Sequence, residues 1–107
     1  MTPSLPVPAD REPSAPLEWA AAEELARTLK AVADPTRLQL LSVILDSADG
    51  RATVSQLTEA LGLRQPTVTH HVRILAEDGL LQRRPEGKFV WLSVADDRRA
   101  AIVDLLR

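Results

Sequence analysis

A mainly α fold with one small β-hairpin is predicted by three observations in the sequence. Apolar residues recur with helical spacing in several segments between Leu17 and Leu106. Capping residues and glycines separate these segments from one another. A single stretch rich in strand-forming residues, Phe89 to Val94, follows a charged turn. The 107 residues of the chain are enough for one domain with a modest core.

The first 16 residues are dominated by proline. Five of the eight prolines of the chain lie there, and proline neither continues a helix nor pairs within a sheet. We expect residues 1–16 to form a flexible arm and residues 17–107 to form a single domain. The spacing of Leu25, Leu29 and Val32 among good helix formers predicts a first helix from Leu17 to about Ala33.

Two capping signals mark the next two helices. Asp34-Pro35 joins a favoured N-cap to a proline at the first helical position. The helix that follows is apolar on almost every side, which predicts burial in the middle of the domain. Thr53 and Gln56 fit the capping box of a short third helix, and Gly62 ends that helix.

A fourth helix opens at Pro66 and ends near Gly79. One helical face carries its apolar residues, which are Val68, Val72 and Leu75. Two short helices separated by a tight turn that contains glycine form a helix-turn-helix pattern. The outward face of the helix that opens at Pro66 is then the candidate functional surface.

A β-hairpin follows the helix-turn-helix pattern. Its predicted strands, Leu80 to Pro85 and Lys88 to Val94, flank a turn at Glu86-Gly87. A helix-turn-helix followed by a hairpin is a winged helix. Asp96 and Asp97 suit the start of a last helix, Asp96 to Leu106, because acidic groups interact favourably with a helix N-terminus.

Composition excludes several kinds of site. The chain has no cysteine, so it has no disulfide, thiolate metal site or cysteine nucleophile. It also has no apolar stretch long enough to cross a membrane and no signal-peptide pattern, so we expect a cytoplasmic protein. The net charge is −2, yet residues 64–93 carry five basic residues against three acidic ones. This local excess fits a small surface for double-stranded DNA, and it also fits an ordinary exposed face.

The outward face of the helix opening at Pro66 is suited to DNA. Polar side chains that can reach base edges in a major groove are Gln65, Thr67, Thr69 and His70. Arg64 and Arg73 suit phosphates or guanine, and free N–H groups at the helix start suit a phosphate. The alternative is an ordinary solvated face. Adjacent side chains on a helix diverge by about 100°, so His70 and His71 cannot share one metal ion, and His71 is expected to be half-buried.

Residues 29–94 resemble the ArsR/SmtB family of bacterial transcriptional repressors. The resemblance lies in residues 29–38 (LKAVADPTRL), in residues 63–75 (LRQPTVTHHVRIL), in Gly79-Leu80-Leu81 and in the hairpin. It implies a homodimeric winged-helix repressor that pairs through its first and last helices, binds operator DNA and is released by an inducer. The dimer contacts would come from Leu17, Trp19, Leu25, Ile102, Leu105 and Leu106.

The resemblance also implies that the helix opening at Pro66 is the recognition helix, and that the hairpin, or wing, touches the DNA beside it. We rank Arg84 and Lys88, near the tip of the wing, above Arg83 as DNA contacts. The alternative for these three cations is protection of an exposed strand edge, for which lysine and arginine are commonly used.

The sequence departs from the family at its sensing sites. Where arsenic- and cadmium-type members carry Cys-x-Cys, this chain has Thr53 and Ser55, which are poor ligands for thiophilic ions. No histidine follows His71, whereas zinc-type members pair Asp with His in the last helix. We therefore expect no metal site and no cofactor. Arg64 stands where the family often has a capping serine, and arginine cannot cap a helix in this way. Either Arg64 adds a phosphate contact instead, or the cap is lost.

Two other classes of function are alternatives to a DNA-binding regulator. A winged-helix protein-interaction or dimerisation module without DNA binding would agree with the net negative charge. An enzyme is not expected, because the sequence contains no nucleophile elbow, phosphate loop or pair of metal-binding motifs.

Overall fold

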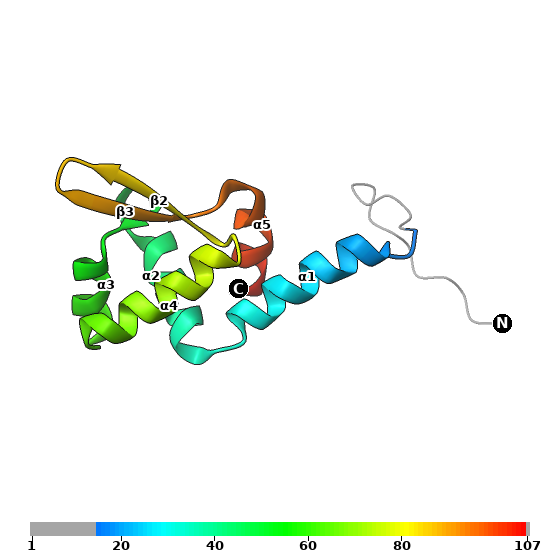
Figure 1. Cartoon of the computed structure of the whole chain (residues 1–107), viewed down its shortest axis with the longest axis horizontal. Coiled ribbons are helices and arrows are strands. Elements are labelled where there is room, and N and C mark those ends of the chain that lie inside the picture. Colours follow the sequence, from blue (N-terminus) through cyan, green and yellow to red (C-terminus); the bar gives the residue numbers. More distant parts are fainter. Residues whose placement is uncertain (1–14, 107) are drawn as a thin grey trace.

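Helices and a small sheet alternate along the chain in the computed structural model, which describes residues 15–106 (Figure 1). The elements are, in order, α1 (Trp19–Val32), α2 (Pro35–Asp46), the 3₁₀ turn η1 (Ala48–Gly50), β1 (Arg51–Ala52), α3 (Val54–Leu61), α4 (Gln65–Glu77), β2 (Leu81–Glu86), β3 (Phe89–Val94) and α5 (Asp96–Leu105). The predicted mainly α fold with a hairpin is confirmed. The predicted Pro-rich arm lies outside the described residues except for Ala15 and Pro16.

The core lies between α2, α3, α4 and the inner face of the sheet. Helix α2 is central to it, as its apolar sequence predicts, and Leu40, Leu41 and Ile44 are completely buried. Buried side chains from the other elements complete a single apolar cluster that includes Leu57, Val68, Val72, Leu75, Leu80, Leu81, Leu92, Val94 and Ile102. This continuous core fixes the position of α4 on the rest of the protomer.

Local capping confirms the predicted helix starts. The Asp34 side chain accepts the N–H of Arg37 at 3.0 Å. At the start of α3, the Thr53 hydroxyl accepts the N–H of Gln56, and the Gln56 side chain accepts the N–H of Thr53. Gly62 ends α3 in the left-handed conformation, with φ of 65°, which glycine adopts without a steric cost. Gly62 thus marks the point where α3 ends and the short turn to α4 begins.

Replacing Asp34 with Ala is expected to lower the free energy of unfolding by about 1 kcal/mol, because the first turn of α2 loses its N-cap. The hydrogen bond from the Arg37 N–H holds the pKa of Asp34 below its ordinary value of 3.8. The contribution of the carboxylate is therefore complete above that value and is lost as pH falls through the lower, folded-state pKa. Urea unfolding at pH 7 and near pH 3, at fixed protein concentration, measures both effects.

The matched control is Asp34→Asn, which still caps the helix but does not titrate. The difference in stability between wild type and this variant should shrink from pH 7 to pH 3. A difference that stays constant over this range would contradict the assignment of the carboxylate as the titrating cap.

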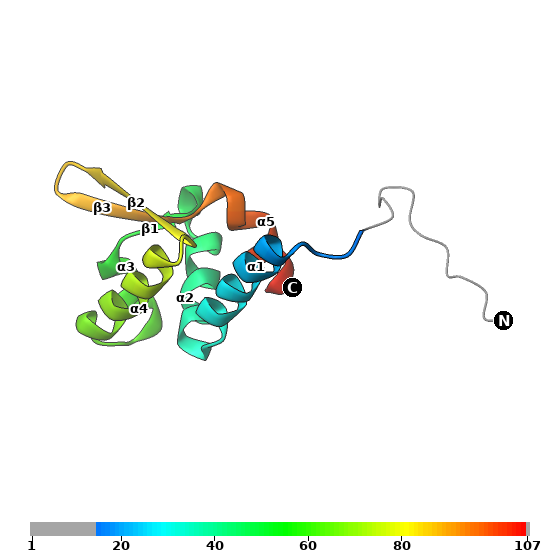
Figure 2. The ribbon, with the colours of Figure 1, turned by 45° about the vertical axis from the view of Figure 1, so that its right-hand side comes forward.

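The sheet has three antiparallel strands in the order β1-β3-β2. Leu81 pairs with Val94 and Arg83 pairs with Leu92, and this face packs on the core. Because side chains alternate along a strand, Arg84 and its partner Trp91 lie on the opposite, outer face. Both views of the ribbon show the helices on one side of the hairpin (Figures 1 and 2).

Several boundaries differ from the prediction. Strand β1 and turn η1 were not predicted. The hairpin loop is Gly87-Lys88, because Glu86 pairs with Phe89 inside the ladder, and Gly87 takes the positive φ that a two-residue loop requires. Helix α5 ends at Leu105, one residue earlier than predicted, and α1 begins at Trp19, so Leu17 precedes it.

The predicted dimer residues lie in different environments. Ile102 is 1% exposed and belongs to the core of its own protomer, so its assignment to an intersubunit contact was wrong. Leu106 is half-buried against that core. The exposed residues of the predicted set are Leu17, Trp19, Leu25 and Leu105, and Leu29 joins them. The buried residues of α1 (Thr28, Ala31 and Val32) are confined to its second half, and Figure 1 shows its first half reaching away from the other helices.

Helix α1 is held to α5 by an ion pair between Glu24 and Arg98. No helix within residues 15–106 is long and apolar enough to cross a membrane.

Candidate nucleic-acid interface

Helix α4 has one buried and one solvent-facing side. Val68, Val72 and Leu75 are buried, as predicted. On the other side Gln65, Thr67, His70 and Arg73 are exposed, and Thr69 is half-buried. The core therefore directs the polar residues of the fourth helix outward as one continuous strip.

Part of this strip is hollowed. A shallow depression of about 350 Å³ is lined by Gln65, Pro66, Thr69, His70 and Arg73. Four of the predicted DNA-binding residues thus share a single concave surface, and Thr67 lies beside it on the exposed part of the same turn. A strip of side chains on one helix, with donors and acceptors of medium length, matches the dimensions of a major groove.

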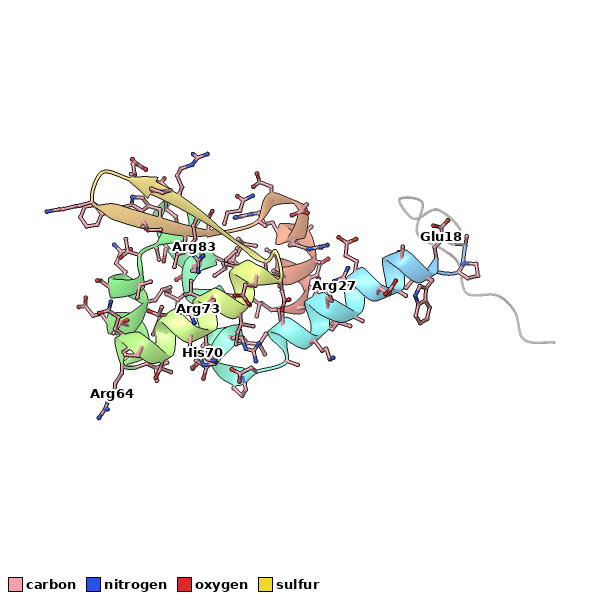
Figure 3. The ribbon with its side chains drawn as sticks, in the orientation of Figure 1. Glu18, Arg27, Arg64, His70, Arg73 and Arg83 are labelled. Atoms are coloured by element: carbon pink, nitrogen blue, oxygen red, sulfur yellow. The ribbon has the colours of Figure 1, made fainter. Side chains whose placement is uncertain are left out.

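The start of α4 differs from the expected phosphate site. Arg64 occupies the N-cap position without a side-chain cap, and Figure 3 shows its side chain extending away from the helix. The N–H groups of Thr67 and Val68 both donate to the Arg64 carbonyl, and Pro66 has none. Within the described residues the Gln65 N–H is the remaining free donor of this turn, so an anion at this end would depend mainly on the Arg64 side chain.

The wing presents different cations on its two faces. Arg83 lies on the face of buried Leu81 and Leu92, toward the helices, whereas Arg84 lies on the outer face with Trp91. In Figure 3, Arg83, Arg73 and His70 follow one another from the hairpin to α4. The register therefore places Arg83, rather than Arg84, on the α4 side of the sheet. The ranking of Arg84 and Lys88 above Arg83 as DNA contacts stays a prediction. Lys88 lies in the loop at the tip and is exposed.

The face of β2 that carries Arg83 could have been predicted from the alternation of side chains along the strand. Leu81 is an apolar residue at the base of β2, and side chains two residues apart share a face. Arg83 therefore had to lie on the inner face once Leu81 was assigned to the core.

Substituting Arg83 and Arg84 one at a time is expected to show which of them contacts DNA. Arg83→Ala should weaken DNA binding by roughly fivefold or more and reduce the salt slope by about one, as loss of a phosphate contact does. Arg84→Ala, the matched control from the opposite face, should have a smaller effect on both. Fluorescence anisotropy at several salt concentrations measures this, and a larger effect from Arg84→Ala would show that the outer face meets the DNA.

A second layer of polar residues supports α4. His71 is half-buried, as expected, and its Nδ1 atom has no hydrogen-bond partner within the described residues. The nearby His71 ring is a further, smaller cause of the lowered pKa of Asp34, after the hydrogen bond from the Arg37 N–H. The rings of His70 and His71 are 5.7 Å apart, with planes inclined by 60°. Consequently His70 is directed to solvent, while His71 packs toward the start of α2.

Among the described residues, no three His, Asp or Glu side chains come together in a way that would hold a metal ion. The Thr53 hydroxyl is engaged in the cap of α3. Asp96 and Asp97 occupy the first turn of α5, where the helix dipole favours acidic groups.

A known domain model matches the central part of the chain. The model is described as a helix-turn-helix domain, and it covers residues 32–84, from the end of α1 into β2. The matched region contains the depression on α4 and both wing arginines.

Known proteins with related sequences are transcriptional regulators. The chain is 37% identical over 92 residues to the HTH-type transcriptional regulator NmtR of Mycobacterium tuberculosis, and the alignment covers 86% of this chain and 74% of that protein. A probable mercury resistance operon repressor of Streptomyces lividans is 42% identical over 82 residues, which cover 77% of this chain and 63% of the relative.

A solved structure agrees with these relatives. The homodimeric winged helix-turn-helix DNA-binding domain of Mb0332 from Mycobacterium bovis, a candidate ArsR-family regulator, superimposes with a TM-score of 0.70 and 26% identity, covering 90% of this chain and 86% of that one. The predicted winged helix-turn-helix fold is thereby confirmed.

Proposed function

Because this chain belongs to the ArsR/SmtB family of winged helix-turn-helix transcriptional regulators, we propose that it is a homodimeric repressor of a pseudo-palindromic operator. The proposal depends on the exposed face of α4. With Val68, Val72 and Leu75 in the core, the exposed polar strip from Gln65 to Arg73 has no partner within the described chain. The repressor acts on DNA in the cytoplasm and blocks transcription by occupying the operator, not by catalysis.

Direct contacts are assigned by the chemistry of each side chain. Gln65, Thr67, Thr69 and His70 read base edges. The cations contact phosphates or guanine, and they are Arg64, Arg73, Arg83, Arg84 and Lys88. Of the two central wing arginines, Arg83 ranks first because it shares the inner face of the sheet.

In a two-fold dimer, each protomer contributes one recognition helix to the DNA-binding surface. The exposed apolar residues of α1 and the end of α5 provide the surface for a second copy, and they include Trp19, Leu25, Leu29 and Leu105. Two recognition helices then meet half-sites about one helical turn apart, roughly 34 Å. This predicts an inverted repeat in the operator.

The test is binding to the DNA upstream of the regulated gene compared with a random duplex of equal length. Fluorescence anisotropy at several salt concentrations should give a specificity ratio of roughly 10³ or more. Equal affinity for the two duplexes would overturn sequence-specific repression. A stable dimer without affinity for either duplex would instead support an interaction module.

Ions of As(III), Cd(II) and Zn(II) are not expected to release the protein from its operator at stoichiometric concentration. The chain has no cysteine, and the hydroxyl of Thr53 already serves as a helix cap. Titration of the protein–operator complex with each ion in a metal-free buffer measures this. High salt serves as the positive control for release, and dissociation at one ion per protomer would contradict the expectation.

A further inference from the structure

The outer face of the sheet is not covered by any helix of the described chain. The cross-strand register collects polar side chains and one aromatic ring on it, namely Arg51, Gln82, Arg84, Trp91 and Ser93. The helices pack on the opposite face. None of these five residues lines the depression on α4.

The uncovered face forms the floor of a groove. Asp49 of η1, Asp96 at the start of α5 and Arg83, at the edge of this face, also line it, and its volume is about 610 Å³. Sites for small molecules typically have volumes of about 300–1,000 Å³. Arg51 and Trp91 also line a second hollow, of about 370 Å³, that continues toward Gln56 and Ala60 of α3. Asp49 has a positive φ of 59°, an uncommon conformation that often occurs at functional sites.

One guanidinium group lies over the Trp91 ring, and a second arginine is the cross-strand partner of Trp91. The Cζ atom of Arg51 lies 4.2 Å from the ring centroid, and its Nη1 donates to Glu86 Oε2 at 2.7 Å. Arg84 pairs with Trp91 across the ladder, is exposed and has no acidic partner within the described residues. Arginine binds carboxylates in a planar, two-point geometry and stacks on aromatic rings.

We propose that this groove binds a small aromatic carboxylate that carries a hydroxyl or amino group, and that this ligand is an effector of the DNA-binding function proposed above. The carboxylate is bound by Arg51 and Arg84, and the ring lies against Trp91. The hydroxyl or amino group donates to Asp49 or Asp96 at the rim. The same two acids disfavour inorganic phosphate and other ligands with several negative charges.

Binding is coupled to the wing through Glu86. This residue directly precedes the Gly87-Lys88 loop, and its negative charge is neutralised by Arg51. A ligand carboxylate competes with Glu86 for that guanidinium. The released Glu86 then adds negative charge beside the DNA-facing wing tip, which repels the phosphate backbone.

Isothermal titration of the full chain with salicylate, 4-hydroxybenzoate and anthranilate tests the site. At least one probe should bind saturably at millimolar concentration or below, and 4-hydroxybenzamide, which lacks the carboxylate charge, should not. Arg51→Gln and Arg84→Gln should each weaken binding by about tenfold or more. The control Arg27→Gln, an exposed arginine on α1, should leave binding unchanged, and thermal unfolding verifies that every variant is folded.

The possible outcomes test the ligand site in the groove and the proposed repressor function separately. No saturable binding of any of the three carboxylates, or equal binding by Arg51→Gln, overturns the site. The bound probe should weaken operator affinity of the wild type but not of Arg51→Gln; unchanged operator affinity overturns the effector role. A protein that binds the probe but no operator DNA supports the groove and overturns the proposed repressor function.

Discussion

The double variant His70→Ala, Arg73→Ala is expected to lose operator binding by roughly 30-fold or more while remaining a folded dimer. Both side chains are exposed on α4 and line the same depression, so their removal leaves the core intact. A specific contact by an arginine is worth about 1–3 kcal/mol, and His70 adds a contact on the adjacent turn. Fluorescence anisotropy with operator and random duplexes measures the loss, and sedimentation confirms the dimer.

The single variants show what each residue contacts. If Arg73 binds a phosphate, Arg73→Ala should weaken binding to all sequences and lower the salt slope by about one. If it binds guanine, the variant should relax specificity at one position of the operator. Glu77→Ala, an exposed substitution at the far end of the same helix, is the control and should not weaken binding. Undiminished operator affinity in the double variant would exclude this face of α4 as the DNA contact.

The helices were predictable because their signals are local. Caps at Asp34 and Thr53, the glycine after α3 and the apolar spacing of α4 each depend on a few neighbouring residues. Strand β1, Arg51–Ala52, has no such signal. It is a strand because it pairs with Ser93 and Leu92 of β3, forty or more positions away, and two residues cannot display a period.

Side-chain environments on short or weakly patterned elements were less predictable. The last helix has apolar residues on several sides, so sequence alone did not separate buried Ile102 from exposed Leu105. The contacts of Arg51 with Trp91 and Glu86 depend on the unpredicted strand. The solvent-facing residues of α4 were predictable, because three buried positions define the opposite face of a regular helix.

Leu25→Glu together with Leu105→Glu is expected to convert the protein into a monomer and to reduce operator affinity by roughly 100-fold or more. Leu25 and Leu105 are 43% and 47% exposed within one protomer, so neither supports the protomer's own core. In a dimer through α1 and α5 they would be buried, and an unpaired carboxylate there is strongly unfavourable. Operator affinity falls because two linked half-site contacts become independent, and linkage typically contributes about 10²–10⁴-fold.

Sedimentation equilibrium and operator anisotropy on the same samples measure both effects. The matched control is Leu25→Met with Leu105→Met, which keeps the apolar surface and should keep the dimer. The thermal transition of the glutamate variant should become independent of protein concentration, whereas that of a dimer rises with concentration. A glutamate variant that remains a dimer would move the subunit interface elsewhere. A monomer that kept full operator affinity would show that one recognition helix and one wing are sufficient for binding.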